Sequence, residues 1–179
     1  MMQKSSTSLL LKYAPLYARG FFEYHIKRRF GPLAPRELMF PITYRCDAKC
    51  VMCNIWKRPK QEEISLTQIN RSFSQELFQG IEAINITGGE PTLRDDLVAA
   101  VDILINSLPK LKKITLTTNA LNPARVVARS TQIADLAGKH KVDFLVEASL
   151  DGIGNTHAKI RNVPNAFKSA TETILKIQQ

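Results

Sequence analysis

The succession of apolar runs from Leu38 onward restricts this chain to a parallel α/β architecture. Four times, an apolar run of strand length is followed by a stretch in which apolar residues recur at helical spacing. Strands joined in this way by helices form right-handed parallel crossovers. The sequence therefore predicts an α/β fold that is part of a parallel (β/α) barrel, with strands at 38–44, 82–87, 113–119 and 142–149.

Caps and breakers mark the expected helices. Ser65 and Gln68 have the spacing of a capping box, and Asn122 with Pro123 provides a cap and a first-turn proline. Gly80, Pro109 and Gly138 then end the first three apolar stripes. These signals place helices at about 65–80, 92–108, 122–138 and 164–176.

The polarity of the strands points to a functional face. The first strand is apolar on both faces, as expected for a parallel strand that is buried on both sides. In the later strands, one face is apolar and the other carries residues such as Asn85, Thr117 and Glu147. We expect helices on the apolar face and the polar set in a concave interior near the carboxyl ends of the strands, where barrels place active sites. A buried carboxylate at Glu147 would be costly unless a polar ligand or partner met it.

The first 37 residues differ from the rest in charge and pattern. They carry +5 of the net charge of +9, and their basic residues are interspersed with aromatic and aliphatic ones. Pro15 and Gly20 interrupt this leader, which predicts short helical pieces and then a linker. We expect a leader and linker at 1–37 that covers the bottom of a domain at 38–179. The alternative is a basic amphipathic segment that lies on an anionic membrane surface or on a partner.

Length and composition predict a soluble, cytoplasmic protein. At 179 residues the chain can bury one core, and no apolar run approaches the roughly 20 residues that span a bilayer. Clustered cysteines without disulfide partners are typical of a reducing compartment. No specific nucleic-acid contact is expected, because the basic excess belongs largely to the leader.

All three cysteines stand within eight residues, directly after the first strand, at Cys46, Cys50 and Cys53. Structural zinc sites and electron-carrying iron-sulfur clusters take four protein ligands, and the sequence has no fourth cysteine. A metal centre with three protein ligands keeps one open position, which is typical of sites that bind a substrate. Zinc binding and three unrelated core cysteines remain as alternatives.

The CxxxCxxC loop formed by these cysteines resembles the motif of the radical S-adenosylmethionine (radical SAM) superfamily. The resemblance implies a [4Fe-4S] cluster held by Cys46, Cys50 and Cys53, with SAM chelating the fourth iron through its amino and carboxylate groups. The family often has an aromatic residue before the third cysteine, where this chain has Met52, which is also apolar and can pack against a sulfide. The implied fold is the first four units of a (β/α)6 barrel.

The segment Gly88-Gly89-Glu90-Pro91, after the second strand, is similar to the GGE motif of the same family. Taken alone, it also suits an ordinary strand-to-helix turn. In the family, the backbone and the Glu of this motif bind the amino end of SAM. The resemblance therefore assigns Gly88, Gly89 and Glu90 to the cofactor site.

The ends of the third and fourth strands look like segments of the branch that contains the molybdenum-cofactor cyclase and SPASM-like peptide-modifying enzymes. This resemblance adds Thr118 and Ser149 to the cofactor site, and Glu147 joins them from the polar strand face. Four further positions match the branch without an assigned role. Asn119 and Asp151 are expected to be turn formers or ligand contacts, and His157 and Arg161 are expected at the surface.

Together, the motifs predict an enzyme. The resemblance implies that an external one-electron reductant of the flavodoxin or ferredoxin type reduces the cluster, and that SAM is cleaved to methionine and a 5'-deoxyadenosyl radical. The radical would abstract a hydrogen atom from a substrate that the sequence leaves unknown. The protein would hold the adenosyl carbon near that hydrogen and exclude water. No catalytic residue beyond the cluster ligands is predicted, because no general base is needed.

The resemblance stops after the fourth unit. A six-unit barrel would continue with two more strands, and four strands leave an edge that natural proteins usually cover. We therefore expect a truncated product or fragment that a completing chain or a homo-oligomer would make whole. The alternative function is a non-catalytic remnant that binds an iron-sulfur cluster or SAM.

Overall fold

The computed structural model of the chain describes residues 6–31, 33–59 and 62–178, with the backbone alone for 6–12. The chain divides into two compact units, residues 1–34 and 35–179. The first unit holds the helix α1 (Ser6–His25) and the short 3-10 helix η1 (Lys27–Phe30). The second unit holds the sheet and all the other helices.

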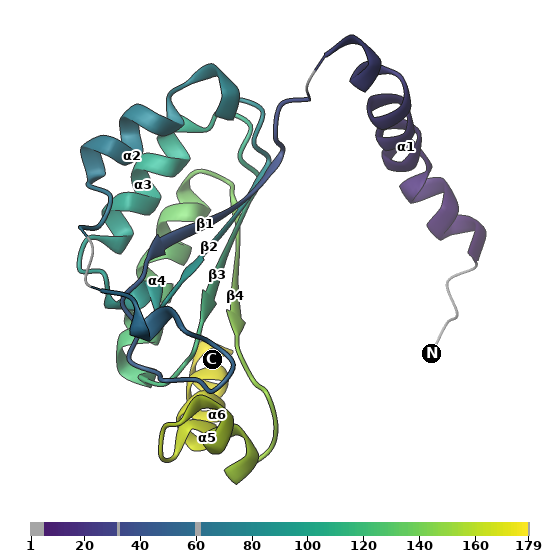
Figure 1. The fold of residues 1–179 in the computed structure, drawn as a ribbon. Helices are drawn as coiled ribbons and strands as arrows, with labels where there is room; N and C mark the ends of the chain where they lie inside the picture. Colours follow the sequence, from purple (N-terminus) through teal and green to yellow (C-terminus); the bar gives the residue numbers. More distant parts are fainter. Residues whose placement is uncertain (1–5, 32, 60–61, 179) are drawn as a thin grey trace. The chain divides into compact units, whose positions relative to one another are not determined.

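The second unit alternates strands with helices along the chain, as Figure 1 shows by colour. Its elements are β1 (Glu37–Thr43), η2 (Ile55–Lys57), α2 (Leu66–Phe73), η3 (Glu76–Phe78), β2 (Ala83–Gly88), η4 (Pro91–Leu93), α3 (Leu97–Ser107), β3 (Lys113–Thr118), α4 (Pro123–Lys139), β4 (Asp143–Ala148), α5 (Asn155–Arg161) and α6 (Ala166–Ile177).

The four strands are all parallel and lie side by side in chain order, β1-β2-β3-β4. Helices α2, α3 and α4 cover one face of this sheet, and α5 and α6 lie near the carboxyl ends of the strands (Figure 1). Consecutive strands that pair in parallel require a crossover between them, and α2, α3 and α4 supply the three crossovers. The predicted α/β fold with four parallel β/α units is confirmed.

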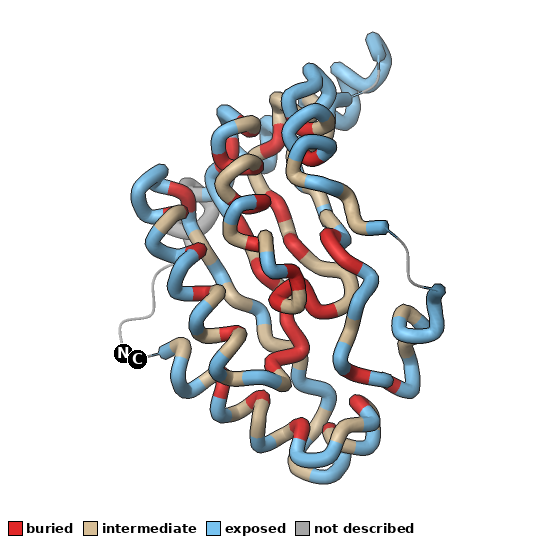
Figure 2. The backbone as a smooth tube through the Cα atoms, turned by 90° about the vertical axis from the view of Figure 1, so that its left-hand side faces the viewer, coloured by how far each residue is buried: buried red, intermediate tan, exposed pale blue. Residues whose placement is uncertain are grey.

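The core lies between the sheet and its covering helices. Ile84, Ile86, Ile114 and Leu116 point to that side from the two central strands and are at most 2% exposed. They pack with buried residues of α3 in one apolar cluster, and Phe144 of β4 packs against its rim. Figure 2 shows the buried backbone positions where strands and helices meet. The predicted assignment of the apolar strand faces to the helix side is therefore confirmed.

The opposite face of the sheet is open, which corrects two expectations. Met39 of β1 is 68% exposed and Leu145 of β4 is 50% exposed, so β1 is not buried on both sides. Glu147 is exposed as well, so its carboxylate carries no burial cost. The reason is that in the described part of residues 35–179 no element packs on this face (Figure 1). The apolar sequence of β1 predicted the burial, but burial also needs a second layer to provide it.

The leader forms a single helix, not the predicted short pieces. α1 runs for 20 residues with Pro15 inside it. A proline removes one backbone hydrogen bond, and Gly20 has no neighbouring atom within 4 Å of its missing side chain. The helix nevertheless continues through both residues. No described helix is long and apolar enough to cross a membrane.

The remaining differences concern element ends. The capping box of Ser65 and Gln68 and the cap of Asn122 start α2 and α4 as predicted. The helix after β2 begins later than expected, because Pro91–Leu93 forms a 3-10 turn and α3 starts only at Leu97. The short helix α5 was not predicted, since its seven residues carry no side-chain cap.

Candidate functional site

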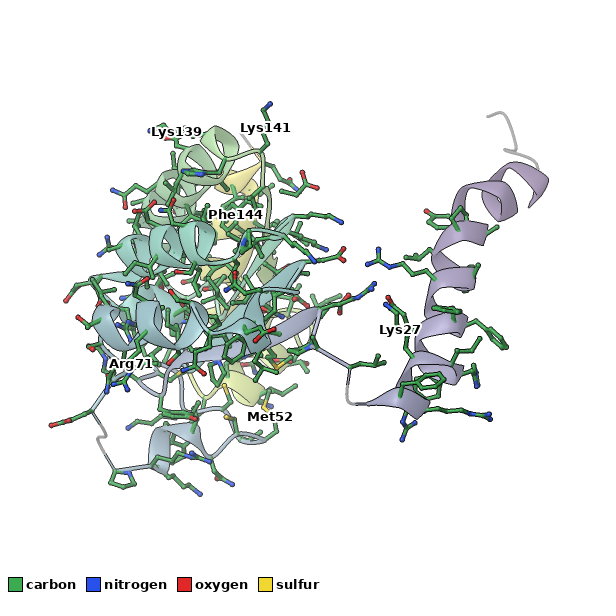
Figure 3. All side chains as sticks on the ribbon, turned by 90° about the horizontal axis from the view of Figure 1, so that it is seen from above. Lys27, Met52, Arg71, Lys139, Lys141 and Phe144 are labelled. Carbon is green, nitrogen blue, oxygen red and sulfur yellow. The ribbon has the colours of Figure 1, made fainter. Side chains whose placement is uncertain are left out.

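The cysteine loop leaves β1 at the carboxyl end of the sheet. Cys50 is buried, while Cys46 and Cys53 are half-buried, and all three are free thiols. The Cys50 carbonyl closes the loop by accepting hydrogen bonds from the Cys53 amide (3.2 Å) and the Trp56 indole (3.4 Å). Met52 projects from the loop and is 58% exposed (Figure 3). The loop therefore presents three thiols on a backbone that is fixed from within.

Two of the sulfur atoms have polar side chains aimed at them from distant parts of the chain. The side-chain amide nitrogen of Asn119 lies 3.8 Å from Cys46 Sγ, and an Arg161 guanidinium nitrogen lies 3.7 Å from Cys50 Sγ. Both are hydrogen-bond donors at distances normal for sulfur. Hydrogen bonds to the ligand atoms are typical of the surroundings of metal-bound thiolates. The donor set of three thiols with two supporting donors thus fits an iron-sulfur cluster.

The environment of Cys46 disfavours a free thiolate. Burial raises the pKa of Cys46, and the nearby Asp47, Glu90 and Cys50 raise it further, against a lowering by the Ala48 backbone amide. A positively charged metal centre would reverse this preference by binding the thiolate. In the described part of the chain, no three His, Cys, Asp or Glu side chains form a group that could hold a single metal ion.

The loop after β2 lies against the start of the cysteine loop. The Gly89 amide donates to the Thr43 carbonyl and the Glu90 amide to the Arg45 carbonyl, both at 2.8 Å. A side chain on Gly88 would place its Cβ 2.2 Å from the Thr43 oxygen, and one on Gly89 would place it 2.0 Å from the Arg45 oxygen. Gly88 also has a φ of 122°, which favours glycine. The two glycines are therefore required for the contact between these backbones.

Glu90 is turned into the protein and acts as a hub. Glu90 is fully buried. Its carboxylate accepts hydrogen bonds from the Thr118 hydroxyl (2.9 and 3.0 Å) and from the Asn119 backbone amide (2.7 Å). It also accepts them from the backbone amide (3.2 Å) and the hydroxyl (2.5 Å) of Thr92. Burial raises the pKa of Glu90, and these hydrogen bonds oppose that rise. The carboxylate thus fastens the β2 loop to the end of β3 and is not exposed to a ligand.

A second set of contacts joins the cysteine loop to α4. Asp47 accepts hydrogen bonds from the Asn119 side chain (2.7 Å) and from Arg125 (2.5 Å), and Arg125 also donates to the Thr92 hydroxyl (3.2 Å). Sequence reasoning missed Asp47, Thr92 and Arg125. The only local signal was the position of Asp47 inside the cysteine motif, because Arg125 lies 78 residues away along the chain.

The segment after β4 contradicts the expectation of surface positions. His157 is fully buried and Arg161 is 9% exposed, because α5 packs on the cysteine loop instead of facing solvent. The Ile160 carbonyl accepts a hydrogen bond from the Val51 amide (2.9 Å), and Asp151 pairs with Arg161 (2.6 Å). A short helix read from sequence alone has no visible buried face, which explains the error.

The other predicted cofactor residues fall into two groups. Thr118 is buried and bonded to Glu90, so its hydroxyl is occupied. Ser149 is half-buried just beyond β4, and Glu147 lies on the open sheet face, where it accepts a hydrogen bond from Thr117 (3.3 Å). Of the predicted cofactor residues, Gly88, Gly89 and Ser149 are therefore half-buried at the carboxyl edge of the sheet and Glu147 is exposed, whereas Thr118 and Glu90 are buried.

A cavity of about 540 Å³ lies beside β1 and is lined in part by Cys46. It lies between β1 and the segment that carries Trp56 and Glu63, and the Thr43 hydroxyl and Arg45 bond to Glu63 at its wall. None of the glycines of the β2 loop, nor Thr118 or Ser149, lines this cavity. Of the predicted site residues, it therefore shares only Cys46.

Comparison with known proteins gives consistent matches. The model of the radical SAM superfamily matches residues 40–179. A GTP 3',8-cyclase from Mannheimia succiniciproducens is 31% identical over 76% of this chain and 42% of its own length. The molybdenum cofactor biosynthesis protein moc-5 of Caenorhabditis elegans is 31% identical over 64% of this chain and 19% of its own.

Among solved structures, SuiB of Streptococcus suis, in a crystal structure bound to S-adenosylmethionine, has a TM-score of 0.56 with this fold. The match covers 93% of this chain and 36% of SuiB at 19% identity, which shows a common fold. The chain spans less than half the length of these relatives.

Proposed function

Because the chain belongs to the radical SAM superfamily, we propose that Cys46, Cys50 and Cys53 hold a [4Fe-4S] cluster whose fourth iron binds SAM. The family and the cyclase relatives make the chain an enzyme by resemblance. The observation that carries the proposal is the donor set: three free thiols in one loop, two of them met by hydrogen-bond donors. When bound, the cluster supplies the electron that cleaves SAM to a 5'-deoxyadenosyl radical for hydrogen abstraction.

The residues around the cysteine loop are proposed to have different roles in binding SAM. The backbone of Gly88 and Gly89 is the group in the GGE loop that a ligand can approach, and it faces the amino end of SAM in our proposal. Glu90 is proposed to hold that backbone in place, because its carboxylate accepts hydrogen bonds from the Thr118 hydroxyl and the Asn119 backbone amide. Ser149 and Glu147 are proposed to contact the ligand from the end and open face of β4.

The substrate and the partners are further parts of the proposal. An external one-electron donor of the flavodoxin or ferredoxin type would supply the electron. The relatives named GTP 3',8-cyclase are matched over at most 42% of their length, so their substrate is not assigned to this chain. A completing chain or a second copy would cover the open face of the sheet.

Anaerobic reconstitution tests the proposal. The wild-type chain is expected to bind iron and sulfide in equal amounts, and single alanine substitutions of Cys46, Cys50 or Cys53 are expected to abolish or strongly reduce that content. Met52→Ala is the matched control, because it changes an exposed residue of the same loop without removing a thiol. Iron and sulfide analysis with electron paramagnetic resonance of the reduced protein gives the readout.

A second measurement separates the enzyme from a non-catalytic remnant. With dithionite and SAM, the enzyme produces 5'-deoxyadenosine, which chromatography detects. A chain that holds its cluster but forms no 5'-deoxyadenosine supports the remnant. Bound zinc in place of iron after anaerobic purification, or iron binding that persists without the cysteines, refutes the proposal.

A further inference from the structure

We infer that Arg161 is a positioning residue for the Cys50 sulfur and that it raises the reduction potential of the cluster. The inference rests on the proposed function, since it concerns the cluster that Cys50 would hold. It gives a role to Arg161, which the sequence had predicted to lie at the surface without an assigned role.

The contact between the two side chains is buried. A guanidinium nitrogen of Arg161 donates to Cys50 Sγ at 3.7 Å, with Arg161 9% exposed and Cys50 7% exposed. Water has little access to either group, so the sulfur is a main partner of this nitrogen. A buried donor that loses its partner destabilises the folded chain, and a charged donor does so more strongly.

The guanidinium is held in place from its other side. Its Nε lies 2.6 Å from an Asp151 carboxylate oxygen, and the Asp151 amide donates to Nδ1 of His157 at 3.1 Å. Because Nδ1 accepts, His157 is neutral there, and burial lowers the pKa of His157 in agreement with this state. His157 thus holds Asp151, and Asp151 holds the Arg161 guanidinium in its orientation.

The backbone docks the same two segments independently. The Val51 amide, next to Cys50, donates to the Ile160 carbonyl, next to Arg161, at 2.9 Å. The loop and α5 therefore meet at two adjacent points. This arrangement limits the freedom of the guanidinium to leave the sulfur when Cys50 becomes a thiolate ligand, and charge then strengthens the hydrogen bond.

The three cysteines are not equivalent in this respect. Cys46 receives its hydrogen bond from the neutral amide of Asn119, whereas Cys50 receives one from a cation. Among the side-chain hydrogen bonds of the described residues, none reaches the sulfur of Cys53. Arg161 is thus the positively charged side chain that donates to a predicted cluster ligand.

The sign of the effect follows from charge. Reduction of the [4Fe-4S] cluster adds one electron, supplied by dithionite in the test below, so the reduced form is more negative than the oxidised form. A donor that carries a positive charge stabilises the more negative form and raises the potential. Hydrogen bonds to sulfur and local charge are established determinants of iron-sulfur potentials.

Anaerobic redox titration of the reconstituted full chain, followed by electron paramagnetic resonance, tests the inference. Arg161→Met removes the charge and the donors, and its midpoint potential is expected to be clearly more negative than that of the wild type. Arg161→Lys keeps the charge without the planar fork, and its midpoint is expected to lie between the two. Lys159→Met is the matched control, because it removes the same charge from an exposed position on α5; its midpoint is expected to equal that of the wild type.

The outcomes discriminate between alternatives. An unchanged midpoint in a folded, cluster-loaded Arg161→Met variant overturns the inference and leaves Arg161 a structural residue. An equal shift in Lys159→Met also overturns it, because the effect would then be a general one of charge. If circular dichroism shows that Arg161→Met does not fold, Arg161→Lys decides, and a wild-type midpoint in that variant overturns the inference. A wild-type chain without iron and sulfide refutes the proposed function itself, which distinguishes that failure from this one.

Discussion

Gly88 and Gly89 show how single residues fix the geometry of the site. Each lies where a Cβ would enter a backbone oxygen of the strand β1 or of the residues after it. The carbonyl groups involved already accept hydrogen bonds from the loop, so they cannot move away without loss of those bonds. The approach of the two loops therefore depends on the absence of side chains at two positions.

Gly89→Ala is expected to destabilise the chain by about 2 kcal/mol or more, because an overpacked site forces the backbone to shift. The matched control is Gly138→Ala, since Gly138 lies inside α4 with no atom within 4 Å of its missing Cβ. Because Gly138 lies in the last turn of α4, alanine there is expected to stabilise the chain by at most about 0.5 kcal/mol. Urea unfolding measures both changes, and equal effects of the two substitutions would contradict the argument.

At the scale of elements, Glu90 connects the loop after β2 with the end of β3. The pKa of Glu90 is raised in the folded state by burial, so the folded chain binds its proton more tightly than the unfolded chain does. Between the unfolded value near 4.5 and the raised folded value, the folded state retains a proton that the unfolded state has released. Stability from this group therefore falls as pH rises through that window.

Glu90→Gln removes this titration and replaces one accepting carboxylate oxygen by an NH2 group. Below pH 4.5, where Glu90 is protonated, the wild type is expected to exceed the variant in unfolding free energy by about 1–3 kcal/mol, because the hydroxyl oxygen of the acid can still accept from a buried donor and the NH2 group of Gln cannot. The difference is expected to shrink as pH rises. Glu172→Gln is the control of opposite sign: the hydrogen bond from Lys176 lowers the pKa of Glu172, so its smaller contribution is lost as pH falls. Urea unfolding over a pH series checks both slopes.

The sequence predicted elements that depend on local signals. Ser65 and Asn122 start helices because a cap acts within three residues, and the strand faces follow from alternation along each strand. The site was predicted in its motifs but not in its support. Arg125 and Arg161 reach the cysteine loop from 78 and 111 residues away, and no local pattern encodes those pairings. The buried role of Glu90 was missed for the same reason, since two of its partners, Thr118 and Asn119, lie at the end of a different strand.

At the scale of the whole sheet, the described part of residues 35–179 covers one face and leaves the other open. Met39 and Leu145 place exposed apolar surface on the open face, and the outer strands β1 and β4 each have one paired edge. Exposed apolar faces and strand edges favour association with other chains. The open face therefore favours contact with another polypeptide or with a second copy.

Leu145→Lys is expected to reduce self-association and to change the unfolding free energy by no more than about 0.5 kcal/mol, because the residue is 50% exposed. Leu77→Lys is the matched control, since Leu77 is 56% exposed on η3, away from the open face. Sedimentation velocity over a concentration series measures the effect. Equal association of the wild type and the Leu145 variant would show that the open face is not a contact surface.

The long reach of Arg161 to Cys50 also orders events during synthesis. A ribosome that adds about 5–20 residues per second needs about 5–20 seconds to make the 111 residues between them. During that interval the nascent loop has its thiols but lacks the helix that later shields Cys50. The Cys50 thiol is thus more accessible to the proposed cluster while the chain emerges than after α5 has packed on the loop.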